Sequence, residues 1–287
     1  MGLVIVMLRG LAVPTEADDP VMVPWTLNIR GRDVRLWVAE DLQIGVFADT
    51  LPWARLLAES PSGELALSQT TDGRVVKLAD RDGDGRADEV VPILSGLDRP
   101  HGLAFAGSVL FIAETHRVLR LDVWWDGASA REIISLPGGG HHFTRSLAVG
   151  PDGKLYVSVG SSCDVCQEND PRRAAVWRFN LDGSGGEPFA TGLRNAVGLA
   201  WEPGAGRLWA TENERNELSP DLPPDELDIL QFGADYGWPG CYGQRVAMPP
   251  FGNPDRCAAT EPPSLELPAH TAPLGLAFYD GHQLPPA

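Results

Sequence analysis

The chain contains 287 residues and carries a formal net charge of −16, with 43% hydrophobic residues, 32 Gly and 25 Pro. Such an excess of carboxylates argues against binding to nucleic acid and to anionic membrane surfaces. No stretch approaches the roughly 20 apolar residues of a membrane helix. The hydrophobic fraction is sufficient for a substantial core, and the Gly and Pro content suits a fold of many tight turns.

The beginning of the chain precedes any clear strand pattern. Residues 1–14 are apolar but are interrupted by Arg9, and their uncharged run is shorter than most signal-peptide cores. We expect 1–24 to be an N-terminal segment that is disordered or the remnant of a signal, and 25–287 to be a single domain. Alternating apolar stretches such as 34–38 predict strands at the start of that domain.

A Leu-Ala pair that ends an apolar run, usually followed by a Gly-centred turn and a second apolar run, recurs five times. The pairs begin at Leu57, Leu103, Leu147, Leu199 and Leu276. Successive pairs are separated by 46, 44, 52 and 77 residues. A step in the mid-forties built from short strands is typical of β-propeller blades.

These steps predict an all-β fold in which blade one covers residues 52–97, blade two 100–136 and blade three 142–191. Blade four is expected to begin near Arg194 and to contain a long insert before Pro273. No segment shows a sustained helical period, so few helices are expected. The sequence therefore predicts roughly four complete blades and the start of a fifth.

In a propeller the innermost strand of each blade lines a central channel, and the loops that lead into these strands gather at one face. Ligands usually occupy such a concave face. Polar residues recur directly before the Leu-Ala pairs, at Arg55, His101, 142–145, Arg194, Asn195 and 270–273. A structural role is the simpler interpretation of any one of them, but their convergence predicts a ligand site.

Two of these residues suggest chemistry. His142 follows three glycines, 138–140, whose backbone can approach a ligand closely. A histidine can act as general base near neutral pH, and Arg194 offers a planar fork of donors to a carboxylate or a quinone oxygen. The structural alternatives are a surface histidine beside a flexible turn and an arginine that pairs with a neighbouring blade.

The insert of blade four is rich in carboxylates and turn residues, at 211–214, 223–228 and 233–239. Side-chain and carbonyl oxygens at this density suit Ca²⁺, which takes 6–8 oxygen ligands. A solvated acidic loop is the alternative.

A second acidic segment lies in the second half of blade one. It matches an EF-hand loop at its first, third and fifth positions and at its glycine, but Val91 stands at the twelfth position in place of Glu. We expect a partial Ca²⁺ site or a tight acidic turn, formed by Asp80, Asp82, Asp84 and Asp88.

The four cysteines form two close pairs. Two residues separate Cys163 from Cys166, and fifteen separate Cys241 from Cys257. A zinc site would require a second close pair or histidines at matching spacing, and neither is present. Two local disulfides are favoured over free thiols, which in turn favours an oxidising compartment, either the periplasm or the exterior.

Several motifs in their order resemble the soluble sugar dehydrogenases that use pyrroloquinoline quinone (PQQ), the glucose/sorbosone dehydrogenase family of six-bladed propellers. The resemblance covers roughly residues 47–281, and its specific parts are 142–147, 150–156, 192–195, 224–226 and 236–239. The run 160–163 with Cys166, and 241–243, are more similar to the sorbosone-type branch than to the glucose-type one.

The resemblance implies roles for individual residues. His142 matches the family's base, which takes the proton of the sugar hydroxyl, and Asp225 matches the carboxylate that orients this base. Arg194 matches the arginine beside the quinone oxygen, where it stabilises developing charge. Asn195 matches a cofactor contact, and His101 at the mouth of blade two is a further candidate.

The cofactor-bridging Ca²⁺ of the family is bound by backbone carbonyls, which correspond to Glu214 and Arg215. Val197 and His141 stand where the family has a glutamine and an acidic residue, which implies a different substrate preference. The family's other cationic cofactor contacts correspond to positions beyond Ala287. We therefore expect residues 1–287 to be a C-terminally truncated propeller that binds PQQ weakly.

The resemblance thus implies a quinoprotein that oxidises an aldose or sorbosone-like sugar and passes electrons to an external acceptor, a quinone or a cytochrome. The alternatives are a Ca²⁺-dependent lactonase-type propeller and a non-catalytic propeller that binds a partner or a glycan. The lactonase would require a carboxylate and asparagines that converge on one channel metal.

Overall fold

The computed structural model describes residues 2–10, 21–40, 42–124, 129–216 and 218–279, with side chains from residue 21 onward. Within these ranges the protein is built from short strands, and the one described helix is α1 (Pro254–Cys257). No described helix is long and apolar enough to cross a membrane. The all-β prediction is confirmed.

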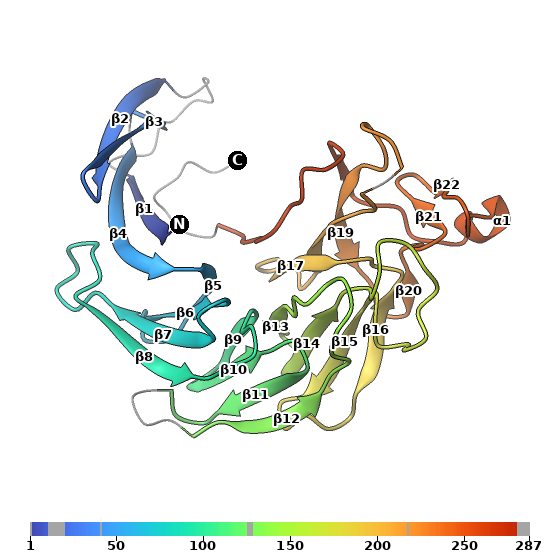
Figure 1. Ribbon diagram of the computed structural model, residues 1–287, viewed down its shortest axis with the longest axis horizontal. Helices are drawn as coiled ribbons and strands as arrows, with labels where there is room; N and C mark the ends of the chain where they lie inside the picture. Colours follow the sequence, from blue (N-terminus) through green and yellow to red (C-terminus); the bar gives the residue numbers. More distant parts are fainter. Residues whose placement is uncertain (1, 11–20, 41, 125–128, 217, 280–287) are drawn as a thin grey trace.

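Four antiparallel sheets follow one another around an arc in a propeller-like arrangement (Figure 1). Blade one consists of β5 (Ala54–Glu59), β6 (Leu65–Gln69), β7 (Arg74–Ala79) and β8 (Glu89–Ser95). Blade two consists of β9 (Leu103–Ala106), β10 (Val109–Ala113), β11 (Arg117–Leu121) and β12 (Arg131–Ser135). The first strand of each blade contains one of the predicted Leu-Ala pairs.

Blade three consists of β13 (Leu147–Val149), β14 (Lys154–Val159), β15 (Ala175–Asn180) and β16 (Glu187–Thr191). Blade four consists of β17 (Ala196–Trp201), β18 (Leu208–Glu212), β19 (Asp225–Leu230) and β23 (Leu265–Leu267). Blade three also has a fifth strand that the sequence did not predict. This strand, β20 (Ala234–Asp235), comes from the insert of blade four and pairs in parallel with β16.

The core lies between the faces of neighbouring blades. On β14, Leu155 and Val157 pack with Phe111 of blade two, whereas Tyr156 packs with Leu208 of blade four. Adjacent side chains of a strand point to opposite faces, so each inner strand is buried on both sides. This two-sided burial explains why the blade strands are nearly continuous apolar runs rather than alternating ones.

The beginning of the chain forms strands that lie outside the four blades. β1 (Gly2–Gly10) pairs antiparallel with β4 (Leu42–Pro52), and β2 (Met22–Ile29) forms a hairpin with β3 (Arg32–Ala39). Figure 1 shows the β1–β4 pair next to blade one and the β2–β3 hairpin beyond β4. Within the N-terminal segment 1–24, residues 2–10 and 22–24 lie in strands, whereas residues 1 and 11–20 lie outside the described part of the chain. The expectation of a disordered segment or a signal remnant stays a prediction.

The fifth Leu-Ala pair lies in a segment without described strand structure, residues 271–279. This segment is nevertheless bonded to blade four: Thr211 Oγ1 donates to Leu274 O (2.8 Å), and Asn213 Nδ2 donates to Pro273 O (2.6 Å). The start of a fifth blade is thus represented by chain that runs beside β17 and β18.

The insert of blade four contains β21 (Cys241–Tyr242), β22 (Val246–Ala247) and α1. Its disulfide joins Cys241 to Cys257, and a second disulfide joins Cys163 to Cys166. The structure therefore confirms the two predicted local disulfides.

Candidate active site

A cavity of about 190 Å³ lies where the loops of blades three and four meet. It brings together five of the residues singled out from the sequence: His142, Arg194, Asn195, Glu214 and Asp225. The other lining residues are Asn213, Asn216, His270 and Ala272. Loops that are distant in sequence thus converge on one site, as the propeller argument predicted.

The hydrogen bonds of His142 define its tautomer. Its Nδ1 lies 2.9 Å from Ser161 Oγ and 3.0 Å from Ser161 O. The Ser161 hydroxyl has a single proton and donates it to Cys163 O (2.6 Å), so Ser161 Oγ must accept at Nδ1. Because both partners are acceptors, Nδ1 carries the proton and Nε2 keeps its lone pair.

The surroundings of His142 keep its ring neutral. Burial, together with the positive charge of Arg194, lowers the pKa of His142 from 6.5 to about 3. The ring is therefore uncharged throughout the physiological range, with an unprotonated Nε2. This is the form that a general base requires.

Arg194 is 2% exposed and is fixed at three of its five N–H groups. Its Nε donates to Asp164 O (2.9 Å), Nη2 to Asp164 Oδ1 (2.7 Å) and Nη1 to Asn213 O (2.8 Å). One N–H on each terminal nitrogen has no partner among the described residues. The guanidinium is thus oriented and still has two donors to offer to a ligand.

Asp225 lies in the cavity but orients backbone rather than His142. Its Oδ1 accepts from Glu214 N (2.8 Å) and its Oδ2 from Ala272 N (2.7 Å). The structure shows no hydrogen bond between Asp225 and His142. The partner that holds the imidazole is Ser161, so the predicted role of Asp225 as the orienter of the base is not seen in this structure.

Behind the cavity lies a group of carboxylates that we call the buried acid cluster: Glu212, Glu214, Glu226 and Asp228. Glu212 and Glu226 stand opposite one another on β18 and β19. Burial and mutual repulsion raise the pKa of Asp228 to about 8 and that of Glu214 to about 7, and also raise the pKa values of Glu212 and Glu226. Four buried carboxyl groups this close together require that some of them are protonated or that a cation lies nearby.

His101 does not line this cavity. Its side chain is fully buried, Nδ1 lies 3.3 Å from Arg145 O, and Nε2 accepts from Arg55 Nε (3.1 Å). Both ring nitrogens are therefore committed inside the fold. The cofactor contact expected from the position of His101 is not available in this arrangement.

The EF-hand-like segment is an acidic turn remote from the cavity. Asp80 accepts from Gly83 N and Gly85 N, and Asp88 accepts from Arg81 N. Oxygen atoms of Asp80, Asp82 and Asp88 lie within 4.8 Å of one another. Asp84 lies outside this group, and its Oδ1 accepts from Arg86 N (2.8 Å). The partial Ca²⁺ site of Asp80, Asp82, Asp84 and Asp88 stays a prediction.

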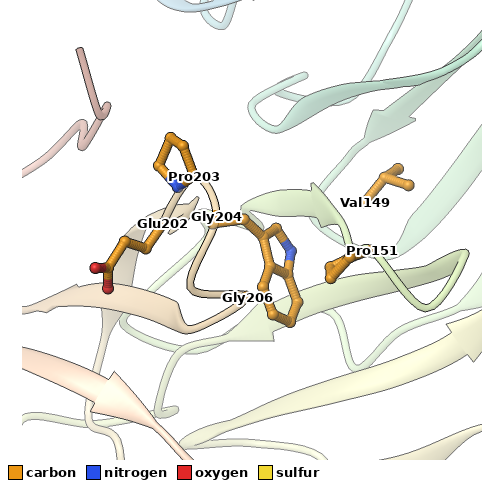
Figure 2. Close-up of a pocket in the computed structure, with 8 residues that line it drawn as sticks. Val149, Pro151, Glu202, Pro203, Gly204 and Gly206 are labelled. Carbon is orange, nitrogen blue, oxygen red and sulfur yellow. The ribbon is translucent and has the colours of Figure 1, made fainter. Parts of the chain in front are cut away.

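A larger cavity of about 420 Å³ lies between the hairpin turns of blades three and four. In Figure 2, Val149 and Pro151 line one side, and Pro203 and Gly204 line the other. None of the residues predicted to carry chemistry lines it. The smaller, polar cavity is therefore the candidate active site.

The polar groups of the candidate site fit a quinone cofactor with a cation. Besides the two donors of Arg194, the Nδ2 of Asn195 has no partner among the described residues, and the carbonyl oxygens of Glu214 and Arg215 accept no described hydrogen bond. Glu212 Oε2 and both carboxylate oxygens of Asp228 are buried without a described partner. Donors for an anionic quinone and acceptors for Ca²⁺ thus lie near one another.

Two residues that contact the site, Ser161 and Asp164, were not predicted from the sequence. Both belong to the loop around the Cys163–Cys166 disulfide. Their position in the Cys163–Cys166 motif was the sequence feature that could have indicated them. The short loop, however, gave no indication of which side chains would turn toward His142 and Arg194.

Comparison with known proteins shows which family the chain resembles. The family model for glucose/sorbosone dehydrogenase matches residues 128–286. An aldose sugar dehydrogenase of Escherichia coli is 27% identical over 164 residues, which is 51% of this chain and 43% of the relative. An uncharacterized protein of Borreliella burgdorferi is 32% identical over 134 residues, which is 46% of this chain and 35% of that protein.

The chain therefore spans less than half the length of these curated relatives. Among solved structures, the PQQ domain of pyranose dehydrogenase from Coprinopsis cinerea superposes with a TM-score of 0.69 at 20% identity. The match covers 82% of this chain and 70% of that domain, and at this identity it shows the fold. Because the family model covers more than half of the sequence, the chain belongs to the glucose/sorbosone dehydrogenase family.

Proposed function

We propose that this protein oxidises an aldose or a sorbosone-like sugar with PQQ as the hydride acceptor. The observation that carries the proposal is the pairing, in one cavity, of a neutral histidine whose Nε2 is free and a buried arginine with two uncommitted donors. A quinoprotein needs both groups at one place. The names of the related dehydrogenases support the same class of reaction.

The residues of the cavity divide the work of alcohol oxidation. Nε2 of His142 takes the proton of the sugar hydroxyl. The hydrogen on the carbon that bears this hydroxyl leaves as hydride, and a carbonyl group forms. When bound, PQQ supplies the electron-pair acceptor. The spare N–H groups of Arg194 are placed to donate to an oxygen on which negative charge develops. The electrons then pass to an external quinone or cytochrome.

Charge balance makes Ca²⁺ part of the proposal. PQQ carries three carboxylates, and Asp164 already neutralises Arg194. Glu214 and Asp225 line the same cavity, so an anionic cofactor would meet repulsion without a cation. The unpartnered carbonyls of Glu214 and Arg215 are the candidate ligands.

The test adds PQQ, Ca²⁺ and a redox dye to the protein with a panel of aldoses and sorbosone. We expect dye reduction that falls by about 10²–10⁴-fold in His142→Ala, the range of general-base catalysis, and that requires both PQQ and Ca²⁺. His116→Ala, an exposed histidine outside the cavity, is the matched control and should retain activity. Dye reduction that survives in His142→Ala would contradict the proposal.

A Ca²⁺-dependent lactonase is the second candidate, because three asparagines and two carboxylates line the cavity. Several of the oxygens that would bind a metal already accept hydrogen bonds: both oxygens of Asp225 from backbone N–H groups, Asn195 Oδ1 from Thr144 Oγ1, and Glu214 Oε2 from Arg215 N. Hydrolysis of lactones with Ca²⁺ but without quinone would favour this candidate over the dehydrogenase.

We further propose a periplasmic or secreted location. The two disulfides support it, because such bonds persist in oxidising compartments. The Cys163–Cys166 motif likewise supports a place in the sorbosone-type branch. Reactivity toward sorbosone above the aldoses in the same assay would be the expected result.

A further inference from the structure

The Cys163–Cys166 disulfide closes a loop that reaches both candidate catalytic residues. Cys163 O accepts the hydroxyl proton of Ser161, whose oxygen faces His142. Asp164, the next residue, contacts Arg194 through two different atoms. This segment therefore contacts both the candidate base and the arginine.

Asp164 holds the arginine in two ways. Its backbone oxygen accepts from Arg194 Nε, and its Oδ1 accepts from Arg194 Nη2 at 2.7 Å. Together they fix the plane of the guanidinium, because the two donors lie on one edge of a rigid fork. Arg194 also donates to Asn213 O on the opposite side.

The carboxylate of Asp164 is itself fixed. Oδ1 also accepts from Asn216 N (3.0 Å), and Oδ2 lies 3.9 Å from Arg215 Nε. The carboxylate that binds Arg194 is therefore itself held from two further directions.

We propose that Asp164 is a positioning residue for Arg194 and that the Cys163–Cys166 disulfide holds Asp164 in place. An effect of Asp164 on catalysis rests on the proposed function, because such an effect requires Arg194 to face the reacting oxygen. The positioning itself does not depend on that function. It concerns only the order of the Arg194 side chain.

The disulfide matters because no strand supports Asp164. The chain leaves β14 at Val159 and does not enter another strand until Ala175. A covalent link across three residues restricts a loop that would otherwise sample many conformations. Without it, the carbonyl and the carboxylate of Asp164 could not stay together on one edge of the guanidinium.

The first arm of the test uses the chain alone, without cofactor. In ¹H–¹⁵N NMR spectra a clamped arginine gives slowly exchanging Nε–H and resolved Nη signals, which can be assigned by their loss in Arg194→Lys. We expect these signals in the wild type. The Nη2 signals, whose acceptor is the Asp164 carboxylate, should broaden or disappear in Asp164→Asn. The Nε–H signal, whose acceptor is the Asp164 carbonyl, should do so as well in the double variant Cys163→Ser/Cys166→Ser.

Asp170→Asn is the matched control. Asp170 forms an ion pair with Arg172 in the same segment of the chain but away from the cavity. It should leave the Arg194 signals unchanged and affect only those of Arg172. Nη2 signals of Arg194 that persist unchanged in Asp164→Asn would overturn the proposal. Thermal melting of each variant ensures that a loss of signal reflects local order rather than unfolding.

The second arm measures sugar oxidation with PQQ and Ca²⁺. Asp164→Asn should lower kcat about tenfold, the lower end for loss of a charge-assisted hydrogen bond, while KM for the sugar stays within about twofold. The variant also removes negative charge beside an anionic cofactor, so PQQ affinity should not fall. A kcat equal to that of Asp170→Asn would overturn the proposal.

The two arms separate this inference from the proposed function. If the wild type shows no dye reduction with any sugar, the proposed function fails and the NMR arm alone decides whether Asp164 positions Arg194. If dye reduction is normal and the Arg194 signals do not respond to Asp164→Asn, the proposed function stands and the positioning role is wrong.

Discussion

His101 and His142 share one property, a neutral ring inside the protein, but they use it differently. Burial lowers the pKa of both to about 3. At His142 the free nitrogen faces a cavity, whereas at His101 both nitrogens bind other parts of the fold. The same perturbation therefore indicates a reactive group at one position and a structural link between blades at the other.

At this scale the structure predicts an acid-sensitive stability. When a histidine has a folded-state pKa below its unfolded value of 6.5, the free energy of unfolding decreases as the pH falls from about 6.5 toward 3. The reason is that only the unfolded state gains the proton in this range. At pH 5.5 the neutral, buried ring of His101 should lower the free energy of unfolding by about 1 kcal/mol. In urea melts at several pH values, the free energy of unfolding should decrease on acidification. We expect His101→Gln to make this decrease, the acid limb, less steep.

The control for this experiment is His116→Gln. His116 is exposed and pairs with Asp98 at the surface, so its replacement should leave the acid limb as it is in the wild type. An acid limb of unchanged slope in His101→Gln would show that the fully buried ring is not its source.

At the scale of elements, the segment that leads into Arg194 depends on close backbone contact with the insert of blade four. Gly192 has a φ of +72°, and a Cβ there would collide with Asp235 Oδ1 and lie 2.5 Å from Gly237 N. Tyr236 N and Trp238 N donate to the carbonyls of Thr191 and Gly192. The insert thus holds the turn from which the arginine emerges.

We expect Gly192→Ala to destabilise the protein by about 2–4 kcal/mol, the sum of a left-handed backbone penalty and overpacking. Gly153→Ala is the matched control, because Gly153 also has a φ of +72° but its Cβ would meet nothing within 4 Å. It should cost only about 1–2 kcal/mol. Equal melting temperatures for the two variants would argue against the contact with the insert.

The elements differ in how far the sequence predicts them. The blades could be found because two-sided burial imposes a repeated apolar pattern around Leu103, Leu147 and Leu199. The pairing of β20 with β16 could not, because a two-residue strand has no pattern of its own. Likewise, His142 and Arg194 stand at repeat positions, but their supports Ser161 and Asp164 depend on the local path of a disulfide loop.

At the scale of the whole molecule, the net charge of −16 is not confined to the surface. The buried acid cluster places four carboxylates inside blade four, and two oxygens of Asp228 have no described partner. The raised pKa values mean that the folded state binds protons more tightly than the unfolded state. This contribution to stability is greatest at low pH and is lost as the pH rises from about 4 to about 8.

We therefore expect Asp228→Asn to raise the melting temperature at pH 8, measured in the presence of a chelator, by roughly 2–4 °C for each 1 kcal/mol of repulsion removed. The gain should vanish near pH 4, where the carboxyl is protonated. Asp221→Asn removes the same charge from an exposed position and serves as the control. A gain of the same size at both pH values would contradict the electrostatic explanation.

The strand that blade three borrows from the insert of blade four has a consequence for the order of folding. During synthesis the N-terminal residues emerge first, and folding follows the emerging chain. β16 ends at Thr191, but its partner β20 begins only at Ala234, so blade three is completed after most of blade four has left the ribosome. The turn before Arg194 acquires its supports in the same step, and the candidate active site is assembled late rather than blade by blade.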